Sequence, residues 1–268
     1  MMNRRKVITA IVIGAGNRGR NVYARYALDH PEELKIVAVA EPNPTRRGLM
    51  VKEHKISANN VFSSWEEAFS RPRFADAAVI TTQDNQHFSP AVQAMKLGYN
   101  VLLEKPMATT AEECKKLVEV SEKEGVLLQI CHVMRFTDFF QVVKDLIKSG
   151  KIGQIVNISW RENVAQFHYA HAYIRGNWHN RELSSPMILA KSCHDLDMLF
   201  WLVESRVEQL SSFGSQLFFG KNEIAWFRKL RQYPWMGVRP HFCAFSCFFV
   251  ILHYNYIWRL LLFSARFF

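Results

Sequence analysis

The stretch that decides the fold is residues 6–19, KVITAIVIGAGNRG. Its first part is a near-continuous run of β-branched and apolar side chains that ends at Ile13, as expected for a strand buried on both faces of a parallel sheet. A G-x-G-x-x-G turn follows from Gly14 to Gly19, and a helical pattern covers residues 21–30. A strand, a glycine-rich turn and a helix in this order predict a dinucleotide-binding βαβ unit.

Each glycine of this turn has its own mechanical reason. Gly14 permits the tight turn out of the strand, Gly16 leaves the backbone open to a pyrophosphate, and Gly19 lets the helix pack closely on the strand. The N-terminus of the helix presents free N–H groups and a partial positive charge to the phosphates. The residues of this turn that we expect at the cofactor are Gly14, Ala15, Gly16, Asn17, Arg18 and Gly19.

The second predicted strand, residues 35–40, ends in an acidic residue. Glu41 stands 22 residues after Gly19, where a carboxylate accepts hydrogen bonds from the ribose hydroxyls and repels a 2′-phosphate. This favours NAD. Arg46 and Arg47 follow closely and carry the charge to hold a 2′-phosphate, so the sequence leaves NADP open, with Arg46 as a candidate contact. The alternative interpretation is a βαβ unit whose glycine turn is incidental.

The bulk composition is that of a globular protein. The 268 residues are 49% hydrophobic and 22% charged, enough for one large domain or two modest ones. Five cysteines, without a C-x-x-C pair, indicate reduced thiols in a cytoplasmic protein rather than a disulfide framework or a zinc site. The first six residues are basic, but the apolar run after them leads into the glycine turn, so we expect no signal peptide.

The net charge of +10 does not indicate nucleic-acid binding. Residues 221–268 contain seven basic residues and a single acid, Glu223, so more than half of the net charge lies there. The first 220 residues show no basic stripe. A modest positive field of this kind suits an anionic cofactor, and we expect no nucleic-acid partner.

Strand and helix patterns alternate up to about residue 130, which predicts a doubly wound α/β domain. In such a sheet the ligand lies outside the carboxyl ends of the strands, so the residues just past each strand are candidates for the site. Further strands are predicted at residues 60–62, 75–82, 100–103 and 126–130, and helices at residues 44–54, 90–97 and 110–124 and directly after Ser63 or Ser64. The candidates at the ends of these strands are Thr82, His87, Glu104, Lys105 and residues 132–136.

Several ordered elements together resemble the Gfo/Idh/MocA oxidoreductase family, the relatives of glucose–fructose oxidoreductase and inositol dehydrogenase. The resemblance covers about residues 6–217. It rests on residues 14–19 and 81–87, Glu104-Lys105-Pro106, Arg135-Phe136, residues 150–153 and His194-Asp195-Leu196-Asp197. It implies a Rossmann domain at residues 1–131 and an α+β domain with a mostly antiparallel open sheet from residue 132. It also implies NAD(P)-dependent hydride transfer involving a secondary alcohol or ketone of a sugar, cyclitol or related polyol.

Lys105 carries the strongest single chemical signal. A lysine at the end of a sheet strand is costly unless its charge is used, and Pro106, if cis, would hold the turn in place. In the family that this chain resembles, the lysine lies beside the nicotinamide and the substrate hydroxyl and helps to move the proton. The alternative is a surface lysine paired with Glu104.

His194 is the second candidate catalytic residue. It lies in an apolar-spaced helix over residues 188–202, and the resemblance implies that it acts as an acid/base group or a ligand of a substrate hydroxyl. The family often has an aspartate four residues earlier, where this chain has Ala190. Lys191 is then a candidate for a polar role. The alternative is a helix histidine satisfied by Asp195 or Asp197.

The segment from Trp160 to Trp178, after a strand predicted at residues 154–160, is crowded with His, Tyr, Arg and Trp. This composition suits a polyhydroxylated ligand, although a phosphate or carboxylate ligand and an aromatic dimer surface remain alternatives. His168 and His171 are three residues apart, but no Cys, Asp or Glu completes a metal set, so we expect no metal. The predicted substrate-binding residues are Arg135, Arg161, His168, Tyr173, Arg175, Lys191 and His194.

The character of the chain changes at about residue 220. Residues 221–268 contain fourteen aromatic side chains, and the strands that would complete the family's open sheet are not recognisable. We therefore expect an incomplete second domain at residues 132–220, an atypical tail and a doubtful sheet-to-sheet homo-oligomer. We expect the tail to be an out-of-frame or otherwise aberrant terminus of a truncated protein. A second interpretation is a membrane-inserted segment at residues 242–263, against which His253, Asn255 and Arg259 argue. The alternative function is that of a catalytically impaired dinucleotide-binding protein or a truncated gene product.

Overall fold

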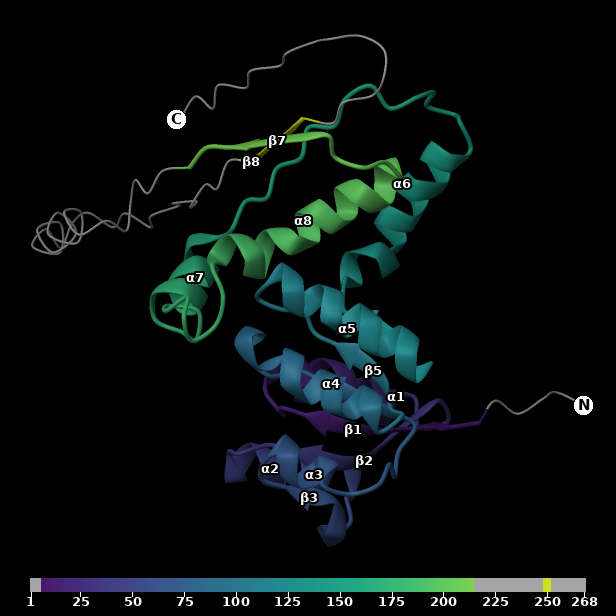
Figure 1. Ribbon diagram of the computed structural model, residues 1–268, viewed down its shortest axis with the longest axis vertical. Helices are drawn as coiled ribbons and strands as arrows, with labels where there is room; N and C mark the ends of the chain where they lie inside the picture. Colours follow the sequence, from purple (N-terminus) through teal and green to yellow (C-terminus); the bar gives the residue numbers. More distant parts are fainter. Residues whose placement is uncertain (1–5, 215–247, 252–268) are drawn as a thin grey trace, which may run out of the picture.

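The computed structural model describes residues 6–214 and 248–251 of the chain (Figure 1). Its main feature is a six-stranded, entirely parallel sheet with the strand order β3-β2-β1-β4-β5-β6. The strands are β1 (Ile8–Ile13), β2 (Leu34–Ala40), β3 (Val61–Phe62), β4 (Ala77–Ile80), β5 (Asn100–Leu103) and β6 (Leu128–Ile130). The predicted doubly wound α/β fold is thereby confirmed.

β1 lies at the centre of the sheet because its side chains are apolar on both faces. Ala10 and Val12 pack into one core cluster and Ile11 and Ile13 into the other, as the alternation of side chains along a strand requires. These four residues are almost completely buried, whereas Ile8 at the start of the strand is exposed. The expected burial on both faces is therefore confirmed from Ala10 onward.

Helices cover both faces of the sheet, and polar residues cap several of them. The Ser64 hydroxyl accepts a hydrogen bond from the Glu67 N–H at 3.3 Å, and the Thr110 hydroxyl accepts one from the Glu113 N–H at 3.2 Å. The helices are α1 (Arg25–Asp29), α2 (Pro44–His54), α3 (Trp65–Phe69), α4 (Phe88–Lys96) and α5 (Ala111–Glu124). A π-helical turn, Gly19–Ala24, precedes α1, so the helix predicted at residues 21–30 is α-helical only in its second half.

The strand order reverses between β1 and β4. At such a switch point the connections leave the two strands in opposite directions, which opens a crevice at their carboxyl ends. The glycine turn follows β1 and the Thr82 loop follows β4, so both reach this crevice. The fold thus gathers the predicted cofactor residues at one edge of the sheet.

The second part of the chain is mainly helical, with α6 (Asp138–Lys148), α7 (Gln166–Tyr169) and α8 (Met187–Val203). In Figure 1, α8 runs between α5 and β7 (Gln209–Ser212). The buried Lys144 ammonium of α6 bonds the carbonyls of Trp201 and Leu202 at the end of α8 and pairs with Glu204 at 2.7 Å. A cation at these free carbonyls favours the helix terminus, so Lys144 fastens α6 to α8.

Two predicted features of this part are wrong. Residues 154–160 belong to no strand of the described structure, and Val156 is 96% exposed. An alternating pattern makes a strand only beside a partner, and within residues 6–214 and 248–251 the strands β7 and β8 pair only with each other. No strand was recognisable within residues 221–268, yet β8 (Phe248–Ile251) pairs antiparallel with β7. Backbone hydrogen bonds hold such a pair, and they need no alternation of side chains.

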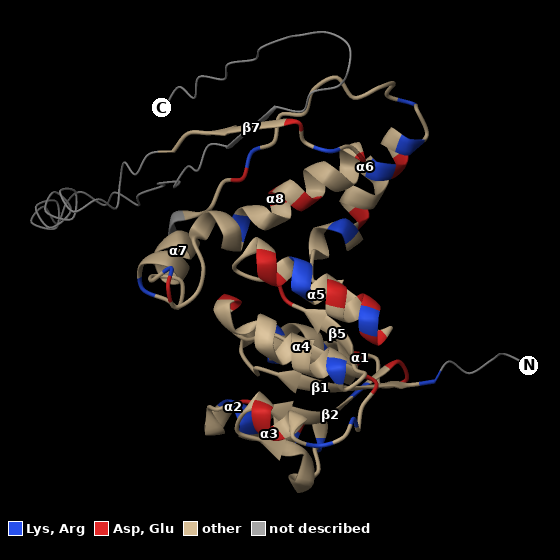
Figure 2. Cartoon of the chain, in the orientation of Figure 1, with Lys and Arg blue, Asp and Glu red and all other residues tan. Residues whose placement is uncertain are grey.

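The remainder of the predicted atypical tail lies outside the described residues, as does most of the alternative membrane segment at residues 242–263. Among the described residues, no helix combines the length and the apolar character that crossing a bilayer requires. Figure 2 shows acidic and basic residues mixed along α5 rather than separated by sign. The boundaries predicted at residues 131 and 220 stay predictions.

Candidate active site

The glycine turn packs against the end of β4. A Cβ atom on Gly14, whose φ is +87°, would lie 2.9 Å from the Thr81 carbonyl oxygen, and one on Gly19 would clash with the Gly14 carbonyl. The mechanical reasons predicted for these two glycines are thereby confirmed. A Cβ on Gly16 would meet nothing within 4 Å. The backbone at Gly16 therefore faces open space, which is the condition for the close approach of a phosphate.

The Glu41 carboxylate is held at the glycine turn. Its Oε2 accepts a hydrogen bond from the Ala15 N–H at 2.7 Å, and its Oε1 accepts one from the Asn43 N–H at 2.9 Å. The side chain is almost fully buried. Arg47 donates to the carbonyls of Glu41 and Pro42, whereas Arg46 is exposed. Glu41 thus has a fixed position between the first and second βα turns, where the ribose was predicted.

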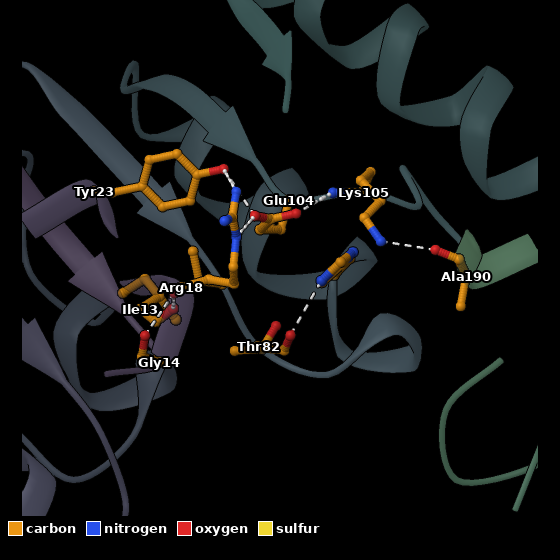
Figure 3. Close-up of polar contacts among 10 residues, drawn as sticks. Ile13, Gly14, Arg18, Tyr23, Thr82, Glu104, Lys105 and Ala190 are labelled. Carbon is orange, nitrogen blue, oxygen red and sulfur yellow. Dashed lines mark hydrogen bonds and ion pairs between the residues drawn. The ribbon is translucent and has the colours of Figure 1, made fainter. Parts of the chain in front are cut away.

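A second carboxylate joins the glycine turn to the lysine turn (Figure 3). Glu104 Oε1 accepts hydrogen bonds from Arg18 Nε at 2.6 Å and from the Tyr23 hydroxyl at 2.7 Å, and Oε2 accepts one from the Lys105 N–H at 2.9 Å. Burial raises the pKa of Glu104, but the bonds from Arg18 and Tyr23 outweigh it, so the pKa lies below its ordinary value. Glu104 is therefore an anion that orients both turns.

Lys105 reaches from the end of β5 to α8. Its Nζ donates a hydrogen bond to the Ala190 carbonyl at 2.7 Å (Figure 3), and the peptide bond between Lys105 and Pro106 is cis. The alternative interpretation paired the lysine charge with Glu104. The structure contradicts it, because the Lys105 group that Glu104 contacts is the backbone N–H and not the ammonium, which points across to the second part of the chain.

His87 links the loop after β4 to the lysine turn. Its ring is 1% exposed, with Nδ1 2.7 Å from the Pro106 carbonyl oxygen and Nε2 3.2 Å from the Thr82 carbonyl oxygen. The Thr82 hydroxyl donates to the Gln86 carbonyl. In this arrangement His87 positions the two loops, and Thr82 lies at the switch-point edge. Their predicted contact with the cofactor stays a prediction.

His194 lies on α8 beside a second histidine. Its ring and that of His132, which follows β6, are edge-on with centroids 5.7 Å apart. Burial and then the charge of Lys105 lower the pKa of His194 to about 4, so the imidazole is neutral at pH 7. The alternative interpretation had Asp195 or Asp197 satisfying His194. Asp195 instead accepts from the Trp160 indole N–H at 2.8 Å.

Asp197 is engaged with Arg135. The guanidinium contacts both carboxylate oxygens, with Arg135 Nε 2.7 Å from Oδ2, and His132 Nε2 lies 3.8 Å from Oδ1. Arg135 was predicted to bind substrate. In the described structure its charge is paired, so its position favours holding Asp197 and the end of β6 against α8.

The remaining predicted substrate residues divide into two groups. Lys191 pairs with Glu162 at 3.3 Å, and burial followed by the charge of Lys191 lowers the pKa of His168. His168 and Tyr173 have ring centroids 6.3 Å apart. These residues lie on the α8 side of the site with Lys105. Arg161 and Arg175 form the second group, and they are exposed, as His168 is.

Several residues of the site were not among the predicted ones. Buried Asp84, after β4, accepts hydrogen bonds from the Trp178 indole at 2.9 Å and from the Ser185 hydroxyl. Asp197 and Glu162 hold Arg135 and Lys191. His132 did stand among the strand-end residues, and that position is the signal that could have singled it out. The other contacts join segments distant in sequence, which no local pattern reports.

Two family models match this chain. Residues 8–132 match the GFO_IDH_MocA model, described as an oxidoreductase family with an NAD-binding Rossmann fold, and residues 140–228 match the GFO/IDH/MocA C-terminal domain. The chain belongs to the Gfo/Idh/MocA oxidoreductase family. Its family match continues to residue 228, beyond residue 217 where the resemblance was expected to end.

Curated proteins are similar to this chain at low identity. The putative oxidoreductase YteT of Bacillus subtilis is 25% identical over 214 residues, which are 78% of this chain and 50% of YteT. The 2,7-anhydro-N-acetylneuraminate hydratase of Escherichia coli is 26% identical over 206 residues, 77% of this chain and 52% of that protein. The chain spans about half the length of the curated relatives it matches.

Solved structures share the fold. The WlbA dehydrogenase of Bordetella pertussis, crystallised with NADH and UDP-GlcNAcA, superposes with a TM-score of 0.64 at 28% identity, over 80% of this chain and 61% of that one. The scyllo-inositol dehydrogenase of Lactobacillus casei, with NAD(H) and scyllo-inositol, gives a TM-score of 0.70 at 21% identity over 79% and 61%. The second likeness supports the fold alone.

Proposed function

We propose that this chain carries the site of an NAD-dependent oxidoreductase that transfers a hydride between the nicotinamide and a secondary alcohol or ketone of a sugar, cyclitol or related polyol. One observation carries the proposal. The ammonium of Lys105, at the carboxyl end of β5, reaches α8 beside neutral His194, at the edge of the sheet where the glycine turn opens. A proton-carrying group and a neutral imidazole at this edge suit an alcohol.

The residues present fit a dinucleotide. The open space at Gly16 would admit the pyrophosphate, the N–H groups of the glycine turn would bind it, and Glu41 would accept from the ribose hydroxyls. The buried carboxylate of Glu41 and the engagement of Arg47 with carbonyls favour NAD over NADP. When bound, the nicotinamide supplies the hydride acceptor or donor. Arg46, exposed at the start of α2, stays a candidate contact for a 2′-phosphate.

The protein groups would handle the oxygen of the substrate. Lys105 Nζ can donate a hydrogen bond to that oxygen and exchange a proton with it. His194 is uncharged at pH 7, so it can accept a hydrogen bond from a hydroxyl or donate one to a carbonyl. Lys191, His168 and Tyr173 on the same side offer donors and ring faces for a polyhydroxylated ligand. Arg161 and Arg175 are exposed and stay candidates for binding a phosphate or carboxylate of the ligand.

A second candidate function is that of a catalytically impaired dinucleotide-binding protein. Ala190 favours it, because its side chain offers no carboxylate near His194. In that case the cofactor would bind without turnover of an alcohol. The two functions therefore differ in whether an alcohol is turned over and whether substitution of Lys105 lowers that turnover.

The experiment uses the full chain, titrated with NADH and NADPH by nicotinamide fluorescence and assayed with NAD and a panel of scyllo-inositol, myo-inositol, D-glucose and UDP-N-acetylglucosamine. We expect NADH to bind more tightly than NADPH. We expect Lys105→Ala to lower turnover by about 100-fold or more and to keep the NADH affinity. Lys115→Ala, on the exposed face of α5, is the control and should match the wild type. Undiminished turnover in Lys105→Ala refutes its role, and NADH binding without any turnover favours the second candidate.

A further inference from the structure

Two histidines in the site have unused ring nitrogens. Nδ1 of His132 and Nδ1 of His194 are both buried, and neither has a hydrogen-bond partner in the described part of the chain. The two rings stand edge-on at an interplanar angle of 81°. Buried polar atoms without a partner are rare in folded proteins, and a neighbouring pair of them indicates a place where a bound group completes the hydrogen bonds.

The surroundings of His132 select one tautomer of its ring. Asp197 Oδ1 lies 3.8 Å from Nε2, and Arg135 fixes that carboxylate through both of its oxygens. A carboxylate next to one ring nitrogen favours the proton on that nitrogen. The proton therefore belongs on Nε2, which leaves a lone pair on the buried Nδ1 of the ring that stands next to His194.

The charges around His132 keep the ring neutral. The groups that face it are Asp197 on α8, Arg135 in the following turn, Lys105 and Glu104 at the end of β5, and His194. Burial is the largest influence, and the attraction of Asp197 opposes it, with the net result that the pKa of His132 lies below its ordinary value. At pH 7 the Nδ1 lone pair is thus free to accept a hydrogen bond.

A hydroxyl group matches this pair of nitrogens. It has one proton to donate and lone pairs to accept with, so it can donate to His132 Nδ1 while it accepts from Lys105 or from His194. A carboxylate or phosphate has no proton to give to the lone pair of His132 when it is fully ionised. The pair therefore distinguishes an alcohol from an anion.

We propose that His132 is a further substrate-binding residue, whose Nδ1 accepts a hydrogen bond from a hydroxyl of the alcohol substrate while Asp197 holds the ring in the required tautomer. The inference rests on the proposed function and adds a specific role to a residue that follows β6. Asp197 and His132 then form a carboxylate–histidine pair in the site. His194 has no such partner at position 190, because Ala190 carries no carboxylate.

The first test reads the tautomer and does not depend on turnover. The full chain is labelled with ¹⁵N-histidine, and two-bond ¹H–¹⁵N correlations are recorded at pH 7, with the His132 signals assigned by their loss in His132→Asn. We expect a neutral ring with its proton on Nε2. A proton on Nδ1, or a doubly protonated ring, overturns the proposal.

The second test compares His132→Asn with His132→Gln, because the Asn amide lies near the position of Nδ1 and the Gln amide near that of Nε2. For a substrate that the wild type turns over, we expect Gln to raise KM about tenfold, the equivalent of one lost hydrogen bond, and Asn to stay within about threefold. Both should bind NADH as the wild type does. Equal KM values in all three proteins overturn the proposal. A wild type without turnover but with the Nε2 proton refutes the proposed function and not the tautomer.

Discussion

Glu104 is the residue that ties the glycine turn to the lysine turn, and it does so through three donors of different kinds. Its partners Arg18 and Tyr23 stand 86 and 81 residues earlier in the chain, so no local pattern could assign the contacts. The sequence could predict that Glu104 ends a buried strand and lies at the cofactor site, but not which groups it contacts. The chemistry at the carboxyl end of β5 therefore depends on a tertiary contact, whereas Gly14 and Gly19 could be explained from the sequence because their constraints are local.

For Glu104→Gln we expect a loss of about 2 kcal/mol in the free energy of unfolding, because two charge-assisted hydrogen bonds are weakened. Part-exposed Arg18 keeps the loss from being larger. The folded pKa of Glu104 lies below the ordinary 4.5, so its contribution is present above about pH 5 and is lost as the pH falls through the folded pKa. Urea unfolding from pH 3 to pH 7 measures the difference. The pair of Arg20 with Glu53, whose carboxylate is more exposed than that of Glu104, is the control, and Glu53→Gln should cost less than about 1 kcal/mol.

At the scale of elements, the predicted bounds hold where the signal is local. α2 begins and ends where its pattern predicted, with Pro44 at its first position and Asn43 capping it, and β5 matches residues 100–103. The failures are elements that depend on partners. Residues 154–160 have the alternation of a strand but no neighbour in the described structure, and β8 has a neighbour without the alternation.

The glycine turn offers a matched pair of substitutions. We expect Gly16→Ala to leave the melting temperature unchanged, because its Cβ meets nothing, and to weaken NADH binding tenfold or more, because the methyl group occupies the approach to the backbone. Gly48→Ala in α2 also adds a Cβ in open space and should keep the affinity. Thermal unfolding measures the melting temperature of both variants, and fluorescence titration measures their affinity for NADH. An unchanged affinity in Gly16→Ala contradicts the predicted phosphate position.

The loop after β4 and the segment at residues 176–185 are joined by Asp84. We expect Asp84→Ala to speed amide hydrogen exchange in that segment by about tenfold, since it leaves the Trp178 and Ser185 donors unpaired. Exchange in β1 and β4 should stay slow and serves as the internal control. If the segment exchanges as in the wild type, the contact to Asp84 is not what holds it.

At the scale of the whole molecule, the buried apolar core is distributed unevenly. The two core clusters lie in the sheet and its helices, whereas from residue 132 onward the described residues that are both apolar and buried are Val164, Ala172, Ala190, Met198 and Leu202. Polar contacts join the two parts, through Lys105 and Asp84. The sheet domain therefore carries most of the described hydrophobic stabilisation.

Limited proteolysis should reveal this difference. We expect a low concentration of trypsin to cut the full chain first after residue 132 and to leave a resistant fragment that retains β1 to β6 and NADH binding. Mass spectrometry of the fragments and fluorescence titration of the digest measure both properties. Early cuts within residues 8–130 would show that the sheet domain is not the more stable part.

The bond from Lys105 to Ala190 has a consequence for how this family site can vary. Its acceptor is a main-chain carbonyl, and every amino acid provides that atom. The hydrogen bond of the lysine therefore depends on the backbone position of α8 and not on which amino acid occupies position 190. Side chains at this position can change, with whatever they bring to the neighbouring histidine, while the ammonium keeps its attachment.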